Sequence, residues 1–145
     1  MIFRKQLKFG LHKLLFDDTE LPQENACLFI FDKKDALPRV LKMWHENPLY
    51  VATYNTSQEC LETLLRTKRP IGKVIVHELF KDKYLVPDNF PIEYKENHAK
   101  IYVSEPYVLL SSANLSHNSS TEFFLFIHNS ALAQKLIQTV FEVAL

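Results

Sequence analysis

Glycine is scarce in this sequence: its 145 residues include only two, Gly10 and Gly72. Loops that cradle phosphate with backbone N–H groups, such as the Walker and dinucleotide-binding loops, need several closely spaced glycines, because the backbone itself must approach the phosphate. Two isolated glycines exclude both kinds of loop. If this protein handles phosphate, side chains must make most of the contacts.

Cysteines and long apolar runs are also few. Cys27 and Cys60 cannot form the disulfide framework of a small secreted domain and are too few for a Cys-based zinc site. None of the histidines has the spacing of a zinc-ligand pair, so we expect no metal. No apolar run approaches the length of a membrane span, and charges interrupt the first 18 residues too often for a signal peptide. These features favour a soluble, cytoplasmic protein without membrane insertion.

The charges balance, with 17 Lys plus Arg and 17 Asp plus Glu. A net charge of zero gives no global attraction to nucleic acid or to an anionic membrane, so phosphate contacts must come from a local cluster. One basic cluster contains Arg66, Lys68, Arg69 and Lys73. It would suit a nucleic-acid backbone, and it would equally suit the solvated end of a helix, where cations are favoured by the helix dipole. Both interpretations stay open.

The composition is that of a globular protein, 47% hydrophobic and 23% charged, in a chain with the length of one domain. Apolar spacing predicts helices over residues 2–16, 34–46 and 130–144, and another that starts at a Thr56–Glu59 capping box and ends before Pro70. Short apolar runs predict strands over 26–31, 48–55, 73–80, 98–103, 107–110 and 122–127. This order predicts one α/β domain over residues 1–145, with a mixed β-sheet flanked by helices on both faces.

One stretch gathers polar residues that could carry chemistry. On a strand, side chains two residues apart share a face, so His98 and Lys100 would point the same way. A hairpin at Pro106 would bring Ser112 and Asn114 level with them. A histidine nitrogen can attack phosphorus, while a cation and neutral donors stabilise charge on the phosphoryl oxygens. The set favours a phosphoryl-transfer site over the plainer interpretation, a solvated edge strand.

This stretch resembles the HKD motif of the phospholipase D superfamily, in which His-x-Lys is followed by an acidic residue and then by a small-Ser-x-Asn stretch. The matching residues are His98, Lys100, Glu105, Ser111, Ser112 and Asn114, with Glu122 as the acidic residue that begins the next strand. Glu105 stands where the family usually has Asp, and Ser111 where it usually has Gly. The resemblance covers residues 48–145 and implies a phospholipase D-like fold.

The resemblance also implies roles for these residues. His98 would be the nucleophile that forms a phosphohistidine, and a second copy of His98 would protonate the leaving oxygen. Lys100 and Asn114 would hold the phosphate oxygens, with help from Ser112, and Glu122 would orient the imidazole. No cofactor is needed. Further contacts to substrate are expected from Ser111, Tyr54, Asn55, Arg66, Lys68 and Arg69.

The family's scheme needs two copies of the motif, and this chain contains one. No other histidine is followed by lysine two positions later, at His12, His45, His77, His117 or His128. The resemblance therefore implies a homodimer whose active histidines face each other across the interface, and an endonuclease that cleaves DNA. Two alternatives stay open: a catalytically inactive module that binds nucleic acid or protein, and a phospholipid hydrolase.

Overall fold

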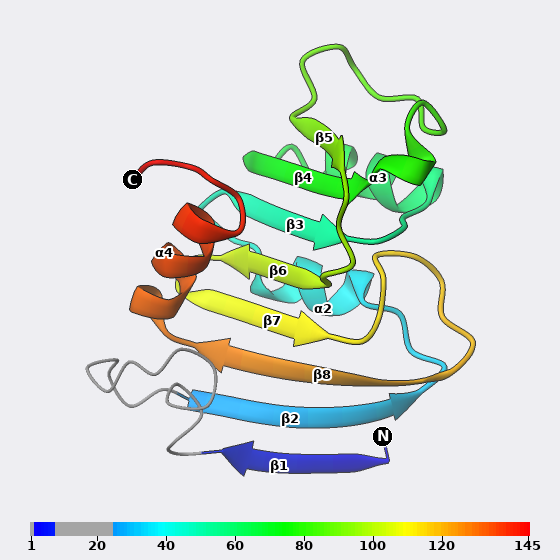
Figure 1. The fold of residues 1–145 in the computed structure, drawn as a ribbon. Helices are drawn as coiled ribbons and strands as arrows, with labels where there is room; N and C mark the ends of the chain where they lie inside the picture. The colour runs from blue at the N-terminus through cyan, green and yellow to red at the C-terminus, as the bar shows by residue number, and fades with distance from the viewer. Residues whose placement is uncertain (1, 8–24) are drawn as a thin grey trace.

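The structure is a computed structural model that describes residues 2–7 and 25–145. Its strands form one eight-stranded mixed sheet in the order β1-β2-β8-β7-β6-β3-β4-β5 (Figure 1). The strands are β1 (Phe3–Leu7), β2 (Asn25–Asp32), β3 (Leu49–Thr53), β4 (Ile71–His77), β5 (Ile92–Lys95), β6 (Ile101–Ser104), β7 (Tyr107–Ser111) and β8 (Thr121–His128). The described helices are α2 (Leu37–Met43), α3 (Gln58–Arg66) and α4 (Ser130–Thr139), with a 3₁₀ turn, η1 (Glu78–Phe80).

The direction of each strand follows from its connection. β3 and β4 are parallel because α3 carries the chain back across the sheet between them, and β4 and β5 are also parallel. A tight turn joins β6 and β7 into an antiparallel hairpin, and β8, β2 and β1 continue the antiparallel pairing. β6 pairs antiparallel with β3, so the start of β6 lies beside the end of β3.

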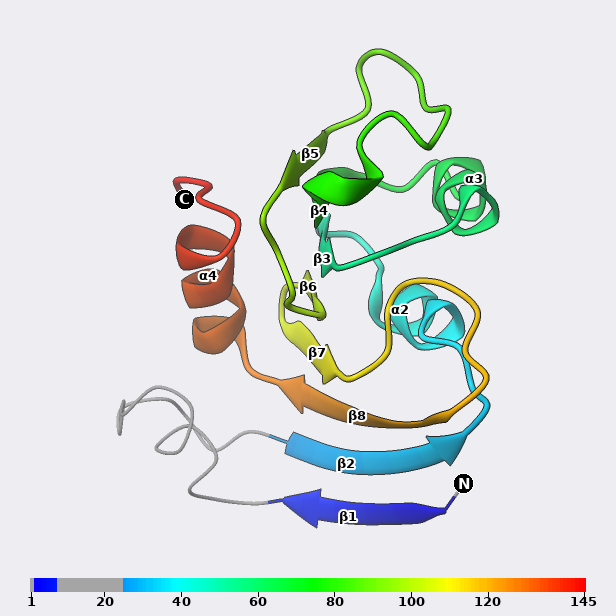
Figure 2. The same cartoon turned by 45° about the vertical axis from the view of Figure 1, so that its right-hand side comes forward.

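Helices cover both faces of the sheet, as predicted. Figure 2 shows α2 and α3 on one face and α4 on the other. The interior strand β3 is buried along its whole length and its side chains alternate between the faces. Leu49 and Val51 belong to the core under α2 and α3, whereas Tyr50 and Ala52 belong to the core under α4. None of the described helices has the length and apolar character needed to cross a bilayer.

The predicted helix over residues 2–16 is wrong where the structure describes it. Residues Phe3–Leu7 form β1, which pairs antiparallel with β2 in a register that places Phe3 opposite Ile30. The edge of β2 offers backbone partners to this segment, and the pairing overrides an apolar spacing that also suits a helix. The rest of the predicted helix lies outside the described residues.

The start of α3 also differs from the prediction. Ser57, not Thr56, is the N-cap, and its hydroxyl accepts a hydrogen bond from the backbone N–H of Cys60 at 3.1 Å. The hydroxyl of Thr56 donates instead to the backbone carbonyl of Leu115 at 2.7 Å. Thr56 therefore ties the loop after β3 to the loop between β7 and β8.

Candidate active site

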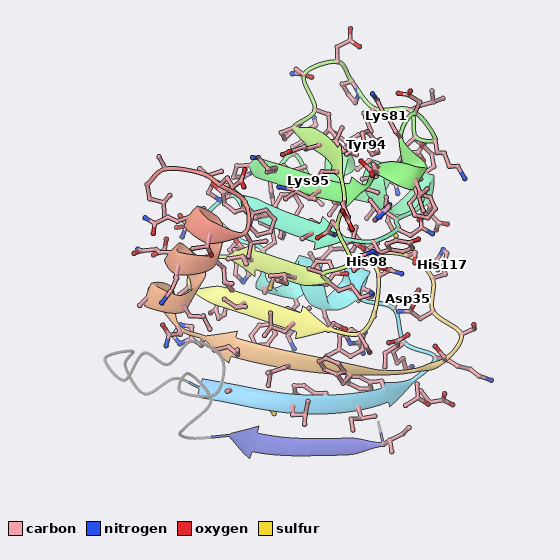
Figure 3. The ribbon with its side chains drawn as sticks, in the orientation of Figure 1. Asp35, Lys81, Tyr94, Lys95, His98 and His117 are labelled. Carbon is pink, nitrogen blue, oxygen red and sulfur yellow. The ribbon has the colours of Figure 1, made fainter. Side chains whose placement is uncertain are left out.

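Three aromatic side chains meet at the carboxyl-terminal ends of β3 and β4. Tyr54 follows β3, His77 ends β4, and His98 precedes β6. The ring of His98 stacks on that of Tyr54, with centroids 5.1 Å apart and planes at 14°. The His77 ring lies 5.0 Å from His98 and 4.8 Å from Tyr54. These rings form the centre of the candidate site, and His98 is exposed there (Figure 3).

The predicted strand over residues 98–103 is wrong at its start, because β6 begins at Ile101. The side chain of Asn97 makes hydrogen bonds to the backbone N–H and carbonyl of Ala99, at 3.3 and 3.1 Å. Such local bonds compete with a strand ladder, so His98 lies in an irregular segment. Lys100 stays close to it, since its Nζ donates to the backbone carbonyl of His98 at 3.3 Å.

The hairpin carries Ser112 and Asn114 toward His98, as predicted. β6 and β7 pair with Ile101 opposite Leu110, and one further bond joins the N–H of Ser111 to the carbonyl of Lys100 at 3.2 Å. The next residues along the chain therefore leave the sheet on the side where His98 lies.

Asn114 holds the loop that follows β3. Its Oδ1 accepts hydrogen bonds from the backbone N–H of Tyr54 at 3.2 Å and of Asn55 at 3.4 Å. Because the Tyr54 ring stacks on His98, this contact also links Asn114 to the imidazole. Within the described part of the chain the Nδ2 group of Asn114 makes no hydrogen bond, so it can donate to a ligand.

Ser112 and Glu122 form a separate pair. The hydroxyl of Ser112 donates to Glu122 and accepts from the backbone N–H of Phe123 at 3.0 Å. The other carboxylate oxygen of Glu122 accepts from the hydroxyl of Ser120 at 3.1 Å. Glu122 is therefore occupied by two serines, and among the described residues no hydrogen bond joins it to His98. The expected orienting contact to the imidazole is not made in this arrangement.

Ser111 was expected to contact substrate, but its hydroxyl is used within the fold. It donates to the backbone carbonyl of Phe123 at 2.6 Å and accepts from the backbone N–H of Ala113 at 2.9 Å. The side chain is buried, with 8% of its surface exposed. A hydroxyl has one proton to donate, so this side chain keeps no donor for a ligand.

The basic residues at the end of α3 and just after it are not brought to the histidines. α3 begins beside the candidate site and runs for nine residues, about 13 Å, toward the end of the sheet where β3 and β4 begin. Arg66 and Lys68 are exposed at that far end. Arg69 donates to the backbone carbonyls of Leu41 and Trp44, which joins it to the end of α2. The separation follows from the topology, since a crossover helix must run opposite to the parallel strands it connects.

The His-x-Lys pattern did not identify His77, because no lysine stands two positions after it. The residue is 7% exposed, and its Nδ1 accepts a hydrogen bond from the backbone N–H of Leu79 at 3.1 Å. In a neutral ring the proton must then lie on Nε2, which makes that atom a donor. One signal could have found this residue: the carboxyl ends of adjacent parallel strands meet at one edge, where ligands commonly bind.

His117 clamps the loop that carries Ser112 and Asn114. Its Nδ1 lies 3.0 Å from a carboxylate oxygen of Asp35, and its Nε2 lies 3.0 Å from one of Glu59. These hydrogen bonds, to Glu59 first and then to Asp35, raise the pKa of His117 above its ordinary value. Figure 3 shows Asp35 and His117 at the same end of the sheet's strands as His98. The clamp joins the loop to the starts of α2 and α3.

No protein-family model matches the chain, and no curated protein is significantly similar to it in sequence. An exposed imidazole, a neighbouring ammonium group and a free amide donor are brought to one edge of the sheet, together with a second, largely buried imidazole.

Proposed function

We propose that this protein is a metal-independent phosphodiesterase with a phospholipase D-like fold, and that its substrate is DNA. The observation that carries the proposal is the placement of His98. Its imidazole is exposed and is stacked on a tyrosine whose backbone is held by Asn114, and the ammonium group of Lys100 donates to the backbone carbonyl of His98. A nucleophile, a cation and an amide donor at one edge suit a phosphoryl centre, where negative charge grows on the non-bridging oxygens.

The proposed reaction has two steps. A ring nitrogen of His98 attacks phosphorus and forms a P–N bond, while the P–O bond to the leaving group breaks and the leaving oxygen takes a proton from a second imidazole. Water then attacks phosphorus and breaks the P–N bond. The proton lost by water returns to the second imidazole, which restores the enzyme. Lys100 and the amide of Asn114 stabilise the phosphoryl oxygens in both steps.

We assign the second imidazole to the His98 of another copy of this chain, in a twofold homodimer. The support is the single His-x-Lys motif in the sequence and the exposure of His98, which leaves its ring accessible to a partner. Solution mass tests this assignment: a monomer that cleaves DNA with unchanged specific activity on dilution would contradict it.

His77 is proposed as a further donor in the same site. The Leu79 N–H at Nδ1 leaves the proton of a neutral ring on Nε2, and the ring lies 5.0 Å from that of His98. A preorganised neutral donor is well suited to a phosphoryl oxygen whose charge increases in the transition state. His77 acts here by hydrogen bonding and not by transferring a proton.

Plasmid cleavage in excess chelator tests the activity. The wild-type protein should nick DNA and His98→Ala should not. His45→Ala is the matched control, because it removes an exposed imidazole near the start of β3, at the other edge of the sheet. Absence of cleavage by the wild type, or equal cleavage by His98→Ala, would contradict the proposal.

The same assay tests whether His77 contributes to the rate of cleavage. His77→Leu should lower the cleavage rate about 100-fold, the usual effect of losing one transition-state donor. His77→Gln should retain most of the rate, because its amide nitrogen can take the place of Nε2. Equal rates for both variants and wild type, with unchanged melting temperatures, would remove His77 from the site.

A second candidate function is a catalytically inactive phospholipase D-like module that binds nucleic acid or protein. The internal hydrogen bonds of Ser111 and the pairing of Glu122 with Ser112 favour it, because both remove groups expected in the reaction. DNA binding by the wild type without cleavage would support this function. Release of a head group from phospholipid vesicles would instead indicate a phospholipid hydrolase.

A further inference from the structure

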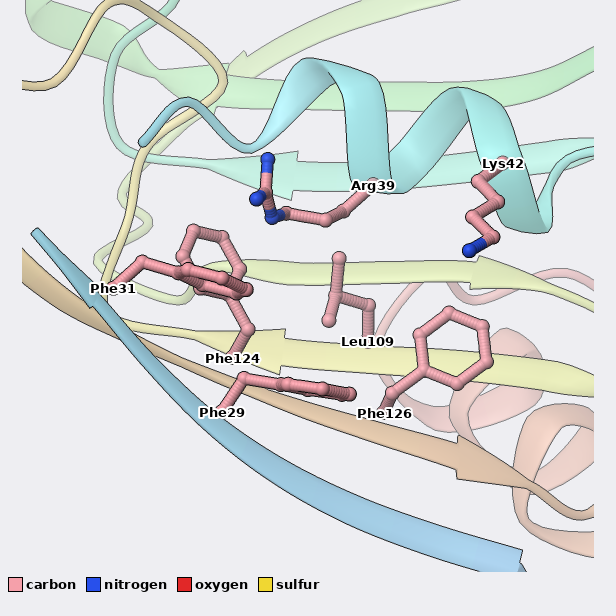
Figure 4. A pocket seen from close by; sticks show the side chains of 7 residues that line it. All are labelled: Phe29, Phe31, Arg39, Lys42, Leu109, Phe124 and Phe126. Atoms are coloured by element: carbon pink, nitrogen blue, oxygen red, sulfur yellow. The ribbon is translucent and has the colours of Figure 1, made fainter. Parts of the chain in front are cut away.

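A cavity separate from the histidines lies between α2 and the sheet. It has a volume of about 180 Å³, and none of its lining residues belongs to the candidate active site. Figure 4 shows α2 above it and strands β2, β7 and β8 below. Its walls are the apolar side chains Phe29, Phe31, Leu109, Phe124 and Phe126.

Two cations from α2 stand at this apolar pocket. Among the described residues that line it, Arg39 and Lys42 are the only charged ones, and none is a carboxylate. The guanidinium carbon of Arg39 lies 4.3 Å from the ring centroid of Phe31 and 5.2 Å from that of Phe124. Lys42 is exposed, and Figure 4 shows its side chain extending from α2 toward the sheet. The pocket therefore combines an aromatic interior with positive charge.

Arg39 has an unused hydrogen-bond donor. Its Nη1 group donates to the backbone carbonyl of Asp35 at 3.0 Å. Its Nε atom is buried and has no partner, the one side-chain nitrogen or oxygen among the described residues in that state. Buried donors are nearly always paired, so an unpaired one marks a place where a ligand can supply the acceptor. Burial also lowers the pKa of Arg39, and the negative charge of Asp35 offsets part of this shift.

We propose that this pocket binds a small planar aromatic carboxylate, with its ring among the phenylalanines and its carboxylate on Arg39. A cavity of about 150 Å³ is enough to hold benzene, so this one admits a one- or two-ring compound. The Nε edge of a guanidinium matches the geometry of a carboxylate, and charge-assisted bonds of this kind are short and strong. Lys42 adds a second positive charge at the other end of the pocket, beside Phe126 (Figure 4).

This site does not depend on the proposed phosphodiesterase activity. Its walls and its cations come from α2, β2, β7 and β8, whereas the candidate active site lies at the ends of β3 and β4. Binding can be measured without any DNA cleavage, so failure of one proposal leaves the other standing.

The test is calorimetric titration of the full chain with 1-naphthoate, and with uncharged 1-naphthalenemethanol as the comparison compound. We expect naphthoate to bind the wild type at least tenfold more tightly than the alcohol, because only the acid completes the hydrogen bonds of Arg39. Arg39→Gln should abolish that preference. Lys42→Gln, a change on the surface that leaves the fold intact, should reduce it by a smaller factor, and Arg66→Gln on α3 should leave it unchanged.

A second variant fills the pocket. Leu109 is fully buried at its floor, and Leu109→Phe should exclude the ring and abolish binding of both compounds. Equal affinity for acid and alcohol would overturn the proposal, because it would indicate an apolar docking site without recognition of the anion. Absence of naphthoate binding at millimolar concentration, or binding by Arg39→Gln as tight as by wild type, would overturn it as well.

Discussion

Replacement of Asn114 by alanine would remove the contact that positions the loop after β3. The side-chain oxygen accepts from the backbone N–H groups of Tyr54 and Asn55, at 3.2 and 3.4 Å. It also lies 3.3 Å from the hydroxyl of Thr53, which is fully buried. Alanine offers no acceptor to these groups, and the part of the loop nearest to Thr53 is shielded from water.

The magnitude follows from the two backbone bonds. A typical hydrogen bond contributes about 1 kcal/mol net, and leaving a buried donor unsatisfied costs about 1–3 kcal/mol. Tyr54 and Asn55 are only partly buried, so water can replace part of what is lost. We therefore expect Asn114→Ala to lower the free energy of unfolding by about 2 kcal/mol.

Asn114→Asp is the matched control, because it keeps an oxygen at the position of Oδ1 but removes the amide donor. We expect its stability to stay within about 1 kcal/mol of wild type, since a carboxylate accepts from backbone N–H groups at least as well as an amide. Its DNA cleavage should nevertheless be lost, because a negative charge would face the phosphate that the Nδ2 group is proposed to bind. This one substitution would then abolish cleavage while leaving the stability of the fold nearly unchanged.

Urea unfolding followed by fluorescence is a suitable assay, because Trp44 is the single tryptophan and is fully buried. A shift in the urea midpoint reports the change in the free energy of unfolding, provided that the dependence of that free energy on urea concentration is the same in variant and wild type. If Asn114→Ala were as stable as wild type, the loop would not depend on the oxygen of Asn114. If Asn114→Asp were as unstable as the alanine variant, an acceptor at this position would not be the cause.

Two further predictions concern other parts of the fold. A Cβ atom at Gly72 would lie 2.4 Å from ring carbons of Tyr50, so Gly72→Ala should destabilise the protein by about 1–3 kcal/mol in urea unfolding. Combining it with Tyr50→Leu should recover part of this loss. If the stability losses of the two single variants simply added in the double variant, a clash between the two residues would be contradicted. Glu59 and Asp35 raise the pKa of His117 above its ordinary 6.5, so its stabilisation is complete below that value and is lost as the pH rises through the raised pKa. The urea midpoint of wild type should exceed that of His117→Gln at about pH 5.5, and a difference that increased toward alkaline pH would contradict this reasoning.

The sequence predicted the sheet and its helices well where local patterns are strong. Six apolar runs became six strands within a few residues, and the helical spacing over 34–46 and 130–144 identified α2 and α4. Residues 3–7 were predicted wrongly as a helix, because the spacing of Phe3 and Leu7, four residues apart, fits a helix and a strand alike. Their pairing with β2, a strand that lies further along the chain, decided that they form a strand.

The candidate site was predicted in part. The hairpin that carries Ser112 and Asn114 to the region of His98 follows from a tight turn between two short strands, and local sequence is enough to specify it. The placement of His77 depends on the parallel pairing of β3 with β4, which no local pattern specifies. Because β3 and β4 are parallel, α3 must return between them, and this places Arg66, Lys68 and Arg69 at the end of the sheet opposite to the histidines.

By itself, the sequence determined which residues could carry phosphoryl chemistry, and it excluded glycine-rich phosphate loops, because residue type and local spacing are sufficient for both conclusions. Only the tertiary structure decided which of those residues meet. His77 joined His98, the basic cluster was separated from both, and Glu122 was bound by Ser112. The physical reason is that strand order and direction bring together residues far apart in the chain, and the hydrogen bonds formed there decide which polar groups remain free.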